Sequence, residues 1–414
     1  MACDEINEYP PICVASTTST PSNSNAPADA AATNLDYPES EAYHFKNIEW
    51  TPDGTTIIAN SSDHHIRSYI LPPDLLETDT PHHLSPFSTL PSAEPTYATA
   101  IYPFYNLQDS STALFLSSVR DHPIRLSSAF SPVNVASYSL VNPTTEAFIT
   151  PHSMVYPPSL GGTHFITGSD SLICLFDVSR TGSDGPVSWI PTIPSKRKQI
   201  VGGGVGMKGI VSAMAVNPSG DGILAAGTFT RHIGLYSSHG SGESLGTFNL
   251  ARTKADRRIG GTGVTQLVWS PCGRYLYIAE RKSDGVLVYD IRVTGQMLGY
   301  LQGRNALSNQ RMKIDIVSSG PDGSHEVWAG GKDGITRVWK NPIYSAGGQD
   351  PDMEFKMHDD AVTSTLFHPM GSVLATCSGQ RHHPSDDLLS ETAPLPRRVD
   401  NSLKVWSMPY LAPD

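Results

Sequence analysis

The sequence predicts an all-β fold, a seven-bladed β-propeller, from a repeated strand pattern and its punctuation. Each repeat runs through an alternating apolar strand, a Pro-x-Gly type turn, a second strand, a polar turn and a third strand that ends on an aromatic residue. Alternation at period two, bounded by Pro and Gly, is typical of half-buried strands joined as hairpins. One such unit cannot bury both faces of its sheet, whereas a closed ring of units can.

The units follow one another along the chain. The clear copies occupy 45–71, 209–238, 263–292, 312–340 and 361–380, the last of which resumes at 401–406. Two weaker copies, at 113–138 and 148–180, fill the gaps and bring the number to seven. The aromatic that ends the third strand stands where WD40 repeats usually carry Trp-Asp, and only Asp177 and Asp290 keep the acid, so we expect divergent WD40 blades of about 40–45 residues with long connections.

Residues outside the repeats predict three further features. Residues 1–40 are rich in Ser, Thr, Pro, Ala and Asn, which predicts a disordered leader, of which residues 5–16 are the candidate for one extra outer strand. The propeller is expected over 41–410. Residues 381–400 interrupt the last unit with a Pro-rich, charged segment, which predicts an exposed loop insertion.

Composition narrows the class of protein. No apolar run approaches the roughly 20 residues that span a bilayer, and the start of the chain lacks a secretory signal pattern. The five cysteines lie far apart with no Cys-x-x-Cys pair, which favours free thiols over a disulfide framework or a zinc site. These features favour an intracellular protein.

Three patterns resemble chemical motifs and fail in context. Gly204 to Gly209 spell Gly-x-Gly-x-x-Gly, but a strand pattern follows where a dinucleotide site needs a helix N-terminus. Ser244 lies in a Gly-x-Ser-x-Gly match, but within a predicted hairpin rather than a strand-to-helix turn. The doublets at His64, His82 and His382 place neighbouring imidazoles on opposite faces of a strand. We therefore expect no enzymatic activity, no cofactor, no metal and no small-molecule substrate.

The distribution of charge is the most informative feature. The net charge is −11, yet residues 151–340 hold 20 basic and 13 acidic residues, while residues 1–150 hold 4 basic and 17 acidic ones. In a propeller, the turns between second and third strands share one rim with the connections between blades. The bases of the chain concentrate in these segments, which predicts a basic rim able to attract phosphates. The candidate RNA-binding residues are Arg120, Lys196, Arg197, Lys198, Lys208, Arg231, Arg257, Arg258, Arg281, Lys282, Arg304, Arg311 and Arg381, and Arg252, Lys254 and Lys332 share the rim.

Several motifs together resemble one family. They are FKNIEWTPDGTTIIANSSDHHIRSYILPPDL, SSVRDHPIRL, GIVSAMAVNPSGDGILAAGTFTRHIGLY, AERKSDGVLVYDIRVTG, SNQRMKIDI and HPMGSVLATCSGQR, in order over residues 45 to about 406. The chain resembles the telomerase Cajal body protein family, WD40 proteins that bind small Cajal body RNAs. The endings of the second and third blades depart from its pattern.

The resemblance implies a nuclear, non-enzymatic scaffold for small nuclear RNA or telomerase RNA and the associated ribonucleoprotein components, with no membrane association. It places Arg120, Arg231, Arg281, Arg311 and Arg381 at matching motif positions. The alternative is a protein-only WD40 adaptor, which is splicing-linked, of the ubiquitin-ligase type or a G-protein-β-like scaffold, in the nucleus or the cytoplasm.

Overall fold

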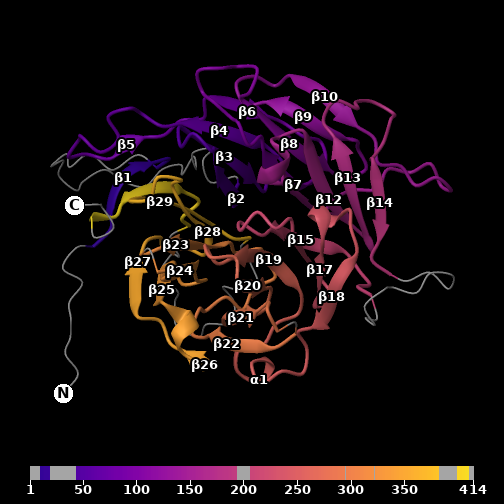
Figure 1. Cartoon of the computed structure of the whole chain (residues 1–414). Helices are drawn as coiled ribbons and strands as arrows, with labels where there is room; N and C mark the ends of the chain where they lie inside the picture. Colours follow the sequence, from indigo (N-terminus) through magenta and orange to yellow (C-terminus); the bar gives the residue numbers. More distant parts are fainter. Residues whose placement is uncertain are drawn as a thin grey trace, which may run out of the picture.

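The computed structural model describes residues 10–18, 43–193, 206–293, 295–320, 322–381 and 399–409. Within these ranges the chain forms seven sheets arranged in a ring, which confirms the seven-bladed propeller (Figure 1). Each blade is an antiparallel sheet whose first strand lies innermost, because short hairpins join consecutive strands.

The first four blades follow the chain in order. Blade 1 holds β2 (Phe45–Trp50), β3 (Thr56–Ser61), β4 (Ile66–Ile70) and β6 (Ser88–Leu90). Blade 2 holds β7 (Thr96–Ile101), β8 (Leu114–Val119), β9 (Ile124–Ser128) and β10 (Asn134–Tyr138). Blade 3 holds β11 (Ser153–Val155), β12 (His164–Ser169), β13 (Leu172–Asp177) and β14 (Ser188–Pro191). Blade 4 holds β15 (Val211–Val216), β16 (Leu224–Thr228), β17 (His232–Tyr236) and β18 (Ser244–Asn249).

Among the described residues, blades 5 and 7 have a fifth strand at the outer edge, and blade 6 has four strands. Blade 5 holds β19 (Val264–Trp269), β20 (Tyr275–Glu280), β21 (Val286–Asp290) and β22 (Met297–Leu301), with β26 (Gly347–Gln349) parallel to β22. Blade 6 holds β23 (Ile314–Ser318), β24 (His325–Gly330), β25 (Ile335–Lys340) and β27 (Met353–Lys356). Blade 7 holds β28 (Val362–Phe367), β29 (Val373–Ser378) and β30 (Leu403–Ser407), followed by β1 (Ile12–Ser16) and β5 (His82–His83).

Helical structure is confined to short connections. These are α1 (Asp256–Ile259) and the 3-10 turns η2 (Pro158–Leu160), η3 (Ser238–Gly240) and η4 (Pro342–Tyr344). No helix of the described residues is long and apolar enough to cross a membrane.

The ring closes where β1 meets β30. Cys13 lies opposite Trp406 and Ala15 opposite Val405 in an antiparallel ladder. The backbone N–H of Thr17 donates to the carbonyl of Leu403 at 3.0 Å, and the Leu403 N–H donates to the Thr17 hydroxyl at 3.0 Å. In Figure 1 the indigo β1 lies beside the yellow strands of blade 7. The fourth strand of the last blade thus comes from the opposite end of the chain.

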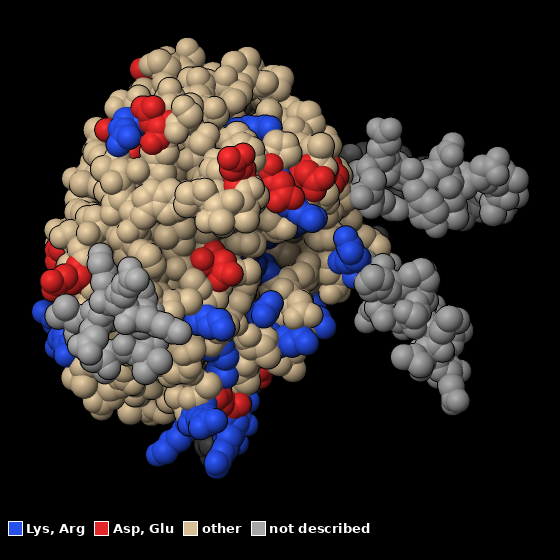
Figure 2. All heavy atoms as spheres, turned by 90° about the vertical axis from the view of Figure 1, so that its right-hand side faces the viewer, with Lys and Arg blue, Asp and Glu red and all other residues tan. Residues whose placement is uncertain are grey.

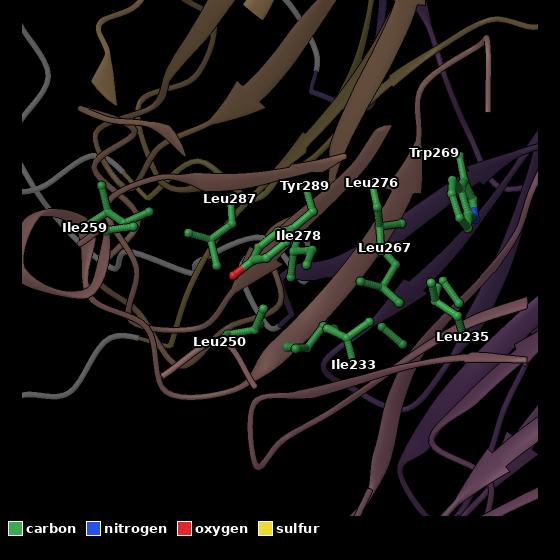
Figure 3. Close-up of a cluster of buried hydrophobic side chains, with 14 residues drawn as sticks. Ile233, Leu235, Leu250, Ile259, Leu267, Trp269, Leu276, Ile278, Leu287 and Tyr289 are labelled. Carbon is green, nitrogen blue, oxygen red and sulfur yellow. The ribbon is translucent and has the colours of Figure 1, made fainter. Parts of the chain in front are cut away.

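The hydrophobic core lies between neighbouring blades. The contact of blades 4 and 5 is an example: Ile233 and Leu235 of β17 pack toward Leu267, Ile278 and Tyr289 of blade 5 (Figure 3). Similar clusters of buried side chains occupy the other blade contacts. Each blade therefore buries its faces only because it has a neighbour on both sides, which is why the repeats must close into a ring.

Polar side chains of the inner strands link the blades around the central channel. The hydroxyls of Ser153, Ser212 and Thr363 donate to carbonyls of the next inner strand, those of Val211 at 2.8 Å, Val264 at 2.6 Å and Phe45 at 2.9 Å. These bonds join the inner strands of blades 3 and 4, of blades 4 and 5, and of blades 7 and 1.

Candidate nucleic-acid interface

One rim of the propeller collects the turns between second and third strands and the connections between blades. Backbone hydrogen bonds join the two kinds of segment: Lys282 N–H donates to Ser308 O at 2.7 Å, and Lys332 N–H donates to Asn305 O at 2.8 Å. Figure 2 shows Lys and Arg gathered around a hollow in the lower part of one face, with acidic groups mostly above it. We call this edge the turn rim.

Most of the candidate bases of the turn rim are exposed. They are Arg120, Lys208, Arg252, Lys254, Arg257, Arg258, Lys282, Lys332 and Arg381. Arg257 and Arg258 lie in α1, in the connection from blade 4 to blade 5. Lys196, Arg197 and Lys198 lie outside the described residues, as does most of the 381–400 insertion.

Arg231 has a different environment from these exposed bases. Its Nε and Nη2 donate to the two carboxylate oxygens of Glu280 at 2.7 and 2.8 Å, and Nη2 also contacts Asp256. The Glu280 side chain is 1% exposed and that of Arg231 is 14% exposed. Burial alone lowers the pKa of Arg231, but its hydrogen bonds and attraction to Glu280 and Asp256 outweigh burial and raise it. Arg231 therefore ties the blade 4 turn to blade 5 and has no free donor fork for a ligand.

Arg304 is enclosed in the protein. It is 1% exposed, and its guanidinium donates to the carbonyls of Gly330 at 3.2 Å and Met312 at 2.7 Å. Burial lowers the pKa of Arg304 to about 10, so the group remains cationic at neutral pH. We leave Arg304 and Arg231 out of the interface proposed below, because their donors serve the fold.

Acidic residues also lie on the turn rim. The count of charged residues along the chain did not show which edge of the ring they occupy. Asp63 pairs with Arg67, Asp333 pairs with Arg337, and both pairs join the turn to the following strand at i and i+4. Hydrogen bonds from Arg67 and Ser61 overcome the effect of burial and lower the pKa of Asp63 to about 2. The recurring Asp-x-x-x-Arg spacing in SDHHIR and KDGITR is a signal that could have found these pairs in the sequence.

A buried polar network in blade 7 also escaped the sequence analysis. His358 Nε2 contacts the Thr376 hydroxyl at 2.7 Å, and the same hydroxyl accepts from Trp406 Nε1 at 2.8 Å. His358 Nδ1 lies 3.2 Å from Asp400 Oδ2, and Lys404 Nζ also lies 3.2 Å from that atom. The network joins β29, β30 and the segments that precede β28 and β30, which is a structural role.

The opposite edge of the ring carries acids that serve its turns. Asp53 accepts from the Thr51 hydroxyl and from the N–H groups of Thr55 and Leu107, which lowers its pKa despite the opposing effect of burial. The cations there include Arg292, which forks onto Asp290 at 2.6 and 3.0 Å. This edge offers no comparable group of free bases among the described residues.

The central channel forms a cavity of about 490 Å³ lined by the inner strands of all seven blades. Its charged lining includes Lys46, Glu49, Arg311 and Lys313. Lys313 Nζ lies 3.2 Å from Glu49 Oε1, so these two charges balance one another. Lys46 has no such partner within hydrogen-bond range in the described residues, and burial lowers its pKa.

Two arginines meet over one aromatic ring where the channel opens onto the turn rim. The guanidinium carbon of Arg281 lies 4.6 Å from the Phe229 ring centroid and that of Arg311 lies 5.6 Å from it. Both are cation–π distances. The structure thus brings together two of the predicted site residues and adds Phe229, a residue that the sequence analysis had not singled out.

The motifs judged accidental lie in ordinary propeller elements. Strand β15 begins directly after Gly209, so no helix N-terminus follows the glycine run. Ser244 is the first residue of β18 and starts an outer strand. Among the described residues, no cluster of three or more His, Cys, Asp and Glu side chains could hold a metal ion.

Comparison with known proteins agrees with the fold. The WD domain, G-beta repeat family matches residues 349–407. Guanine nucleotide-binding protein negative regulator 1 of Schizosaccharomyces pombe is 31% identical over 72% of this chain and 70% of its own length. Telomerase Cajal body protein 1 of Homo sapiens is 29% identical over 82% of this chain and 57% of its own length. Protein SWT21 of Kluyveromyces lactis is 26% identical over 78% of this chain and 77% of its own length.

The chain spans about three fifths of the length of the telomerase Cajal body proteins that it matches. The similarity to them and to the fission-yeast regulator covers most of the propeller, in agreement with the motifs quoted above. The chain belongs to the family of divergent WD40 proteins that contains the telomerase Cajal body proteins and guanine nucleotide-binding protein negative regulator 1.

Proposed function

We propose that this protein is a non-enzymatic scaffold that binds a small nuclear RNA, of the Cajal body or telomerase type, through the exposed bases of the turn rim. In this role it acts in the assembly or localisation of a ribonucleoprotein in the nucleus. The names of the telomerase Cajal body relatives support this class of particle.

The observation that carries the proposal is a group of exposed bases on the turn rim that have no ion pair in the described part of the chain. The partly buried Arg67, Arg231 and Arg337 each have a carboxylate partner. The exposed Lys208, Lys254, Arg257, Arg258 and Lys282 have no ion pair with any described residue. Unpaired bases grouped on one rim can neutralise phosphates and so release the cations condensed on an RNA backbone, which favours association with RNA.

The same rim suits single-stranded RNA better than a duplex. Phe229 and the stacked pair Tyr97 and His152, whose centroids lie 4.6 Å apart, stand near the channel mouth, within the ring of bases. Aromatic and guanidinium planes are the platforms on which unpaired bases stack, and proteins read RNA sequence mainly from unpaired bases. We therefore propose that an unpaired loop of the RNA lies across the mouth.

The test is a matched pair of charge-reversal variants. The rim variant carries Arg257→Glu, Arg258→Glu and Lys282→Glu, and the control carries Arg180→Glu, Arg274→Glu and Lys340→Glu on the opposite edge. Both change the net charge equally. RNA recovered by crosslinking to the wild-type protein is titrated at several salt concentrations. The rim variant is expected to bind at least about tenfold more weakly, with a slope of log K against log salt smaller by roughly 2, at about 0.7 per lost phosphate contact.

A rim variant with wild-type affinity, or a control that loses as much, would refute the rim assignment. The second candidate is a protein-only adaptor, favoured by the 31% identity to a relative named as a regulator of a guanine nucleotide-binding protein. It predicts that the partners of the purified protein persist after nuclease treatment and that no RNA crosslinks to it.

A further inference from the structure

The mouth of the central channel contains an arginine with unused donors. Arg281 begins the turn between β20 and β21, and its side chain lies against Phe229. Its Nε is buried and has no hydrogen-bond partner, and no described residue forms an ion pair with its guanidinium. A buried N–H group that lost water without gaining an acceptor destabilises the protein, so an acceptor from outside the chain would stabilise it.

Arg311, from the connection between blades 5 and 6, lines the channel beside it. Its guanidinium makes one hydrogen bond among the described residues, from Nη2 to the His152 carbonyl at 3.3 Å. Burial lowers the pKa of Arg311 to about 10, and no carboxylate opposes that effect. The group is still charged at neutral pH, so it is a partly buried cation without an ion-pair partner among the described residues.

Three other arginines near the turn rim pair with carboxylates, whereas the buried Arg304 donates to carbonyls. Arg67, Arg231 and Arg337 all fork onto carboxylates from their own or a neighbouring blade. The nearby channel acid, Glu49, is already taken by Lys313 and by the Thr99 hydroxyl, at 3.2 and 2.9 Å. The positive charge of Arg281 and Arg311 is therefore left for a ligand.

We propose that Arg281 and Arg311 form a phosphate-binding site at the mouth of the channel, with Phe229 as the surface that orients their guanidinium planes. Both guanidinium carbons lie within 6 Å of one ring centroid, so two cations gather around the same aromatic side chain and together attract an anion. The non-bridging oxygens of a backbone phosphodiester, and the oxygens of a phosphate monoester or pyrophosphate, can each accept from a guanidinium fork.

Gly263 lets the backbone pass very close to this site. A Cβ on Gly263 would lie 2.7 Å from the Phe229 carbonyl and 3.1 Å from Arg281 Nε, so the backbone passes directly beside the guanidinium. The backbone therefore shields one side of the Arg281 guanidinium, and a phosphate group would approach it from another side.

The phosphate belongs either to the RNA backbone or to a small soluble phosphate compound. In the first case the inference rests on the proposed function and names the innermost contact of the same RNA. In the second case the site is independent of it. Inorganic pyrophosphate is the probe that separates the site itself from RNA binding.

The experiment titrates pyrophosphate and the crosslinked RNA into the full chain, by calorimetry at physiological salt. The variants are Arg281→Gln and Arg311→Gln, with Arg274→Gln, an exposed arginine of the opposite edge, as the matched control. Wild type and control are expected to bind pyrophosphate, and each site variant about tenfold or more weakly, because each loses a charge-assisted fork. Arg281→Lys should recover only part of the loss, since an ammonium group lacks the planar fork.

Pyrophosphate that fails to bind wild type, or binds the site variants as tightly, overturns the site whatever happens to RNA. If the site variants also weaken RNA binding, the phosphate is that of the RNA. If they leave RNA affinity unchanged, the ligand is a small phosphate compound. In a further outcome, the site variants lose pyrophosphate binding while the rim charge-reversal variant keeps full RNA affinity. That result would contradict the proposed function and support the phosphate site.

Thermal unfolding without ligand distinguishes a binding role from a structural one. Removal of an uncompensated buried cation should leave the unliganded Arg311→Gln variant at least as stable as wild type, and pyrophosphate should stabilise wild type more than the variant. A large fall in Tm for both unliganded site variants would mean that the two arginines serve the fold, which contradicts the proposal.

Discussion

Replacement of Arg231 by Met should destabilise the fold and not merely weaken a ligand contact. The side chain neutralises Glu280, which is 1% exposed and held by two hydrogen bonds of 2.7 and 2.8 Å. Breaking a buried pair by removing one partner costs about 3–5 kcal/mol, and the partial exposure of Arg231 favours the lower end, near 3 kcal/mol. Urea unfolding at pH 8, followed by intrinsic fluorescence, measures the loss.

The same variant carries a pH signature. Burial raises the pKa of Glu280, and loss of Arg231 would raise it further. A carboxyl whose pKa is higher in the folded state than in the unfolded state gives its full stability when protonated, and that stability falls as the pH rises. The deficit of Arg231→Met should therefore shrink from pH 8 toward pH 5. Adding Glu280→Gln should recover part of the lost stability at pH 8.

A change in unfolding free energy below about 1 kcal/mol would refute this account, because surface ion pairs have that value. So would a double variant no more stable than the single one, since the argument depends on the uncompensated charge of Glu280. Arg292→Met is the matched control: its partner Asp290 lies on the opposite edge, and the Arg292 side chain is 57% exposed. It should change little.

Three other predictions concern the fold. Burial raises the pKa of Asp315 to about 6, so Asp315→Asn, which can still accept from the Phe367 N–H, should be more stable than wild type at pH 8. Its advantage in urea midpoint should vanish near pH 4, where the unfolded carboxyl also binds a proton. Gly285→Ala places a Cβ 1.9 Å from the Leu301 carbonyl, and should lower the unfolding free energy by about 1–3 kcal/mol. Wild-type denaturant stability in that variant would show that the backbone there can shift. Deletion of residues 1–18 uncovers the edge of β30 and should lower Tm by on the order of 5 °C and increase light scattering, and an unchanged Tm would count against β1 as a structural strand.

The fold was predictable because its signals are local. Strand alternation, turn residues and the repeat itself appear within windows of about 30 residues, and they give the seven blades directly. The rim assignment was also largely predictable, since topology alone decides which turns share an edge.

The partners of each arginine were not predictable in the same way. Arg231 meets Asp256 and Glu280, which are 25 and 49 residues away and belong to the next blade and its connection. The guanidinium groups of Arg281 and Arg311 both lie close to the ring of Phe229, which belongs to a turn of blade 4. The spacing of residues in the sequence does not give the distance between side chains of different blades. An arginine with a carboxylate partner and one without therefore cannot be told apart before the blades are placed in the ring.

The strand that completes the last blade has a consequence for biosynthesis. Thr17 and its partner Leu403 lie 386 residues apart. At a translation rate of about 5–20 residues per second, β1 leaves the ribosome roughly 20–80 s before the strand that it joins. During that interval the other blades can stack as an open arc. The edge of β1 that later pairs with β30 then has no hydrogen-bond partner in that strand. Ring closure therefore waits until β30 has been synthesised, and a nascent chain stalled before blade 7 would expose both ends of the arc to chaperones.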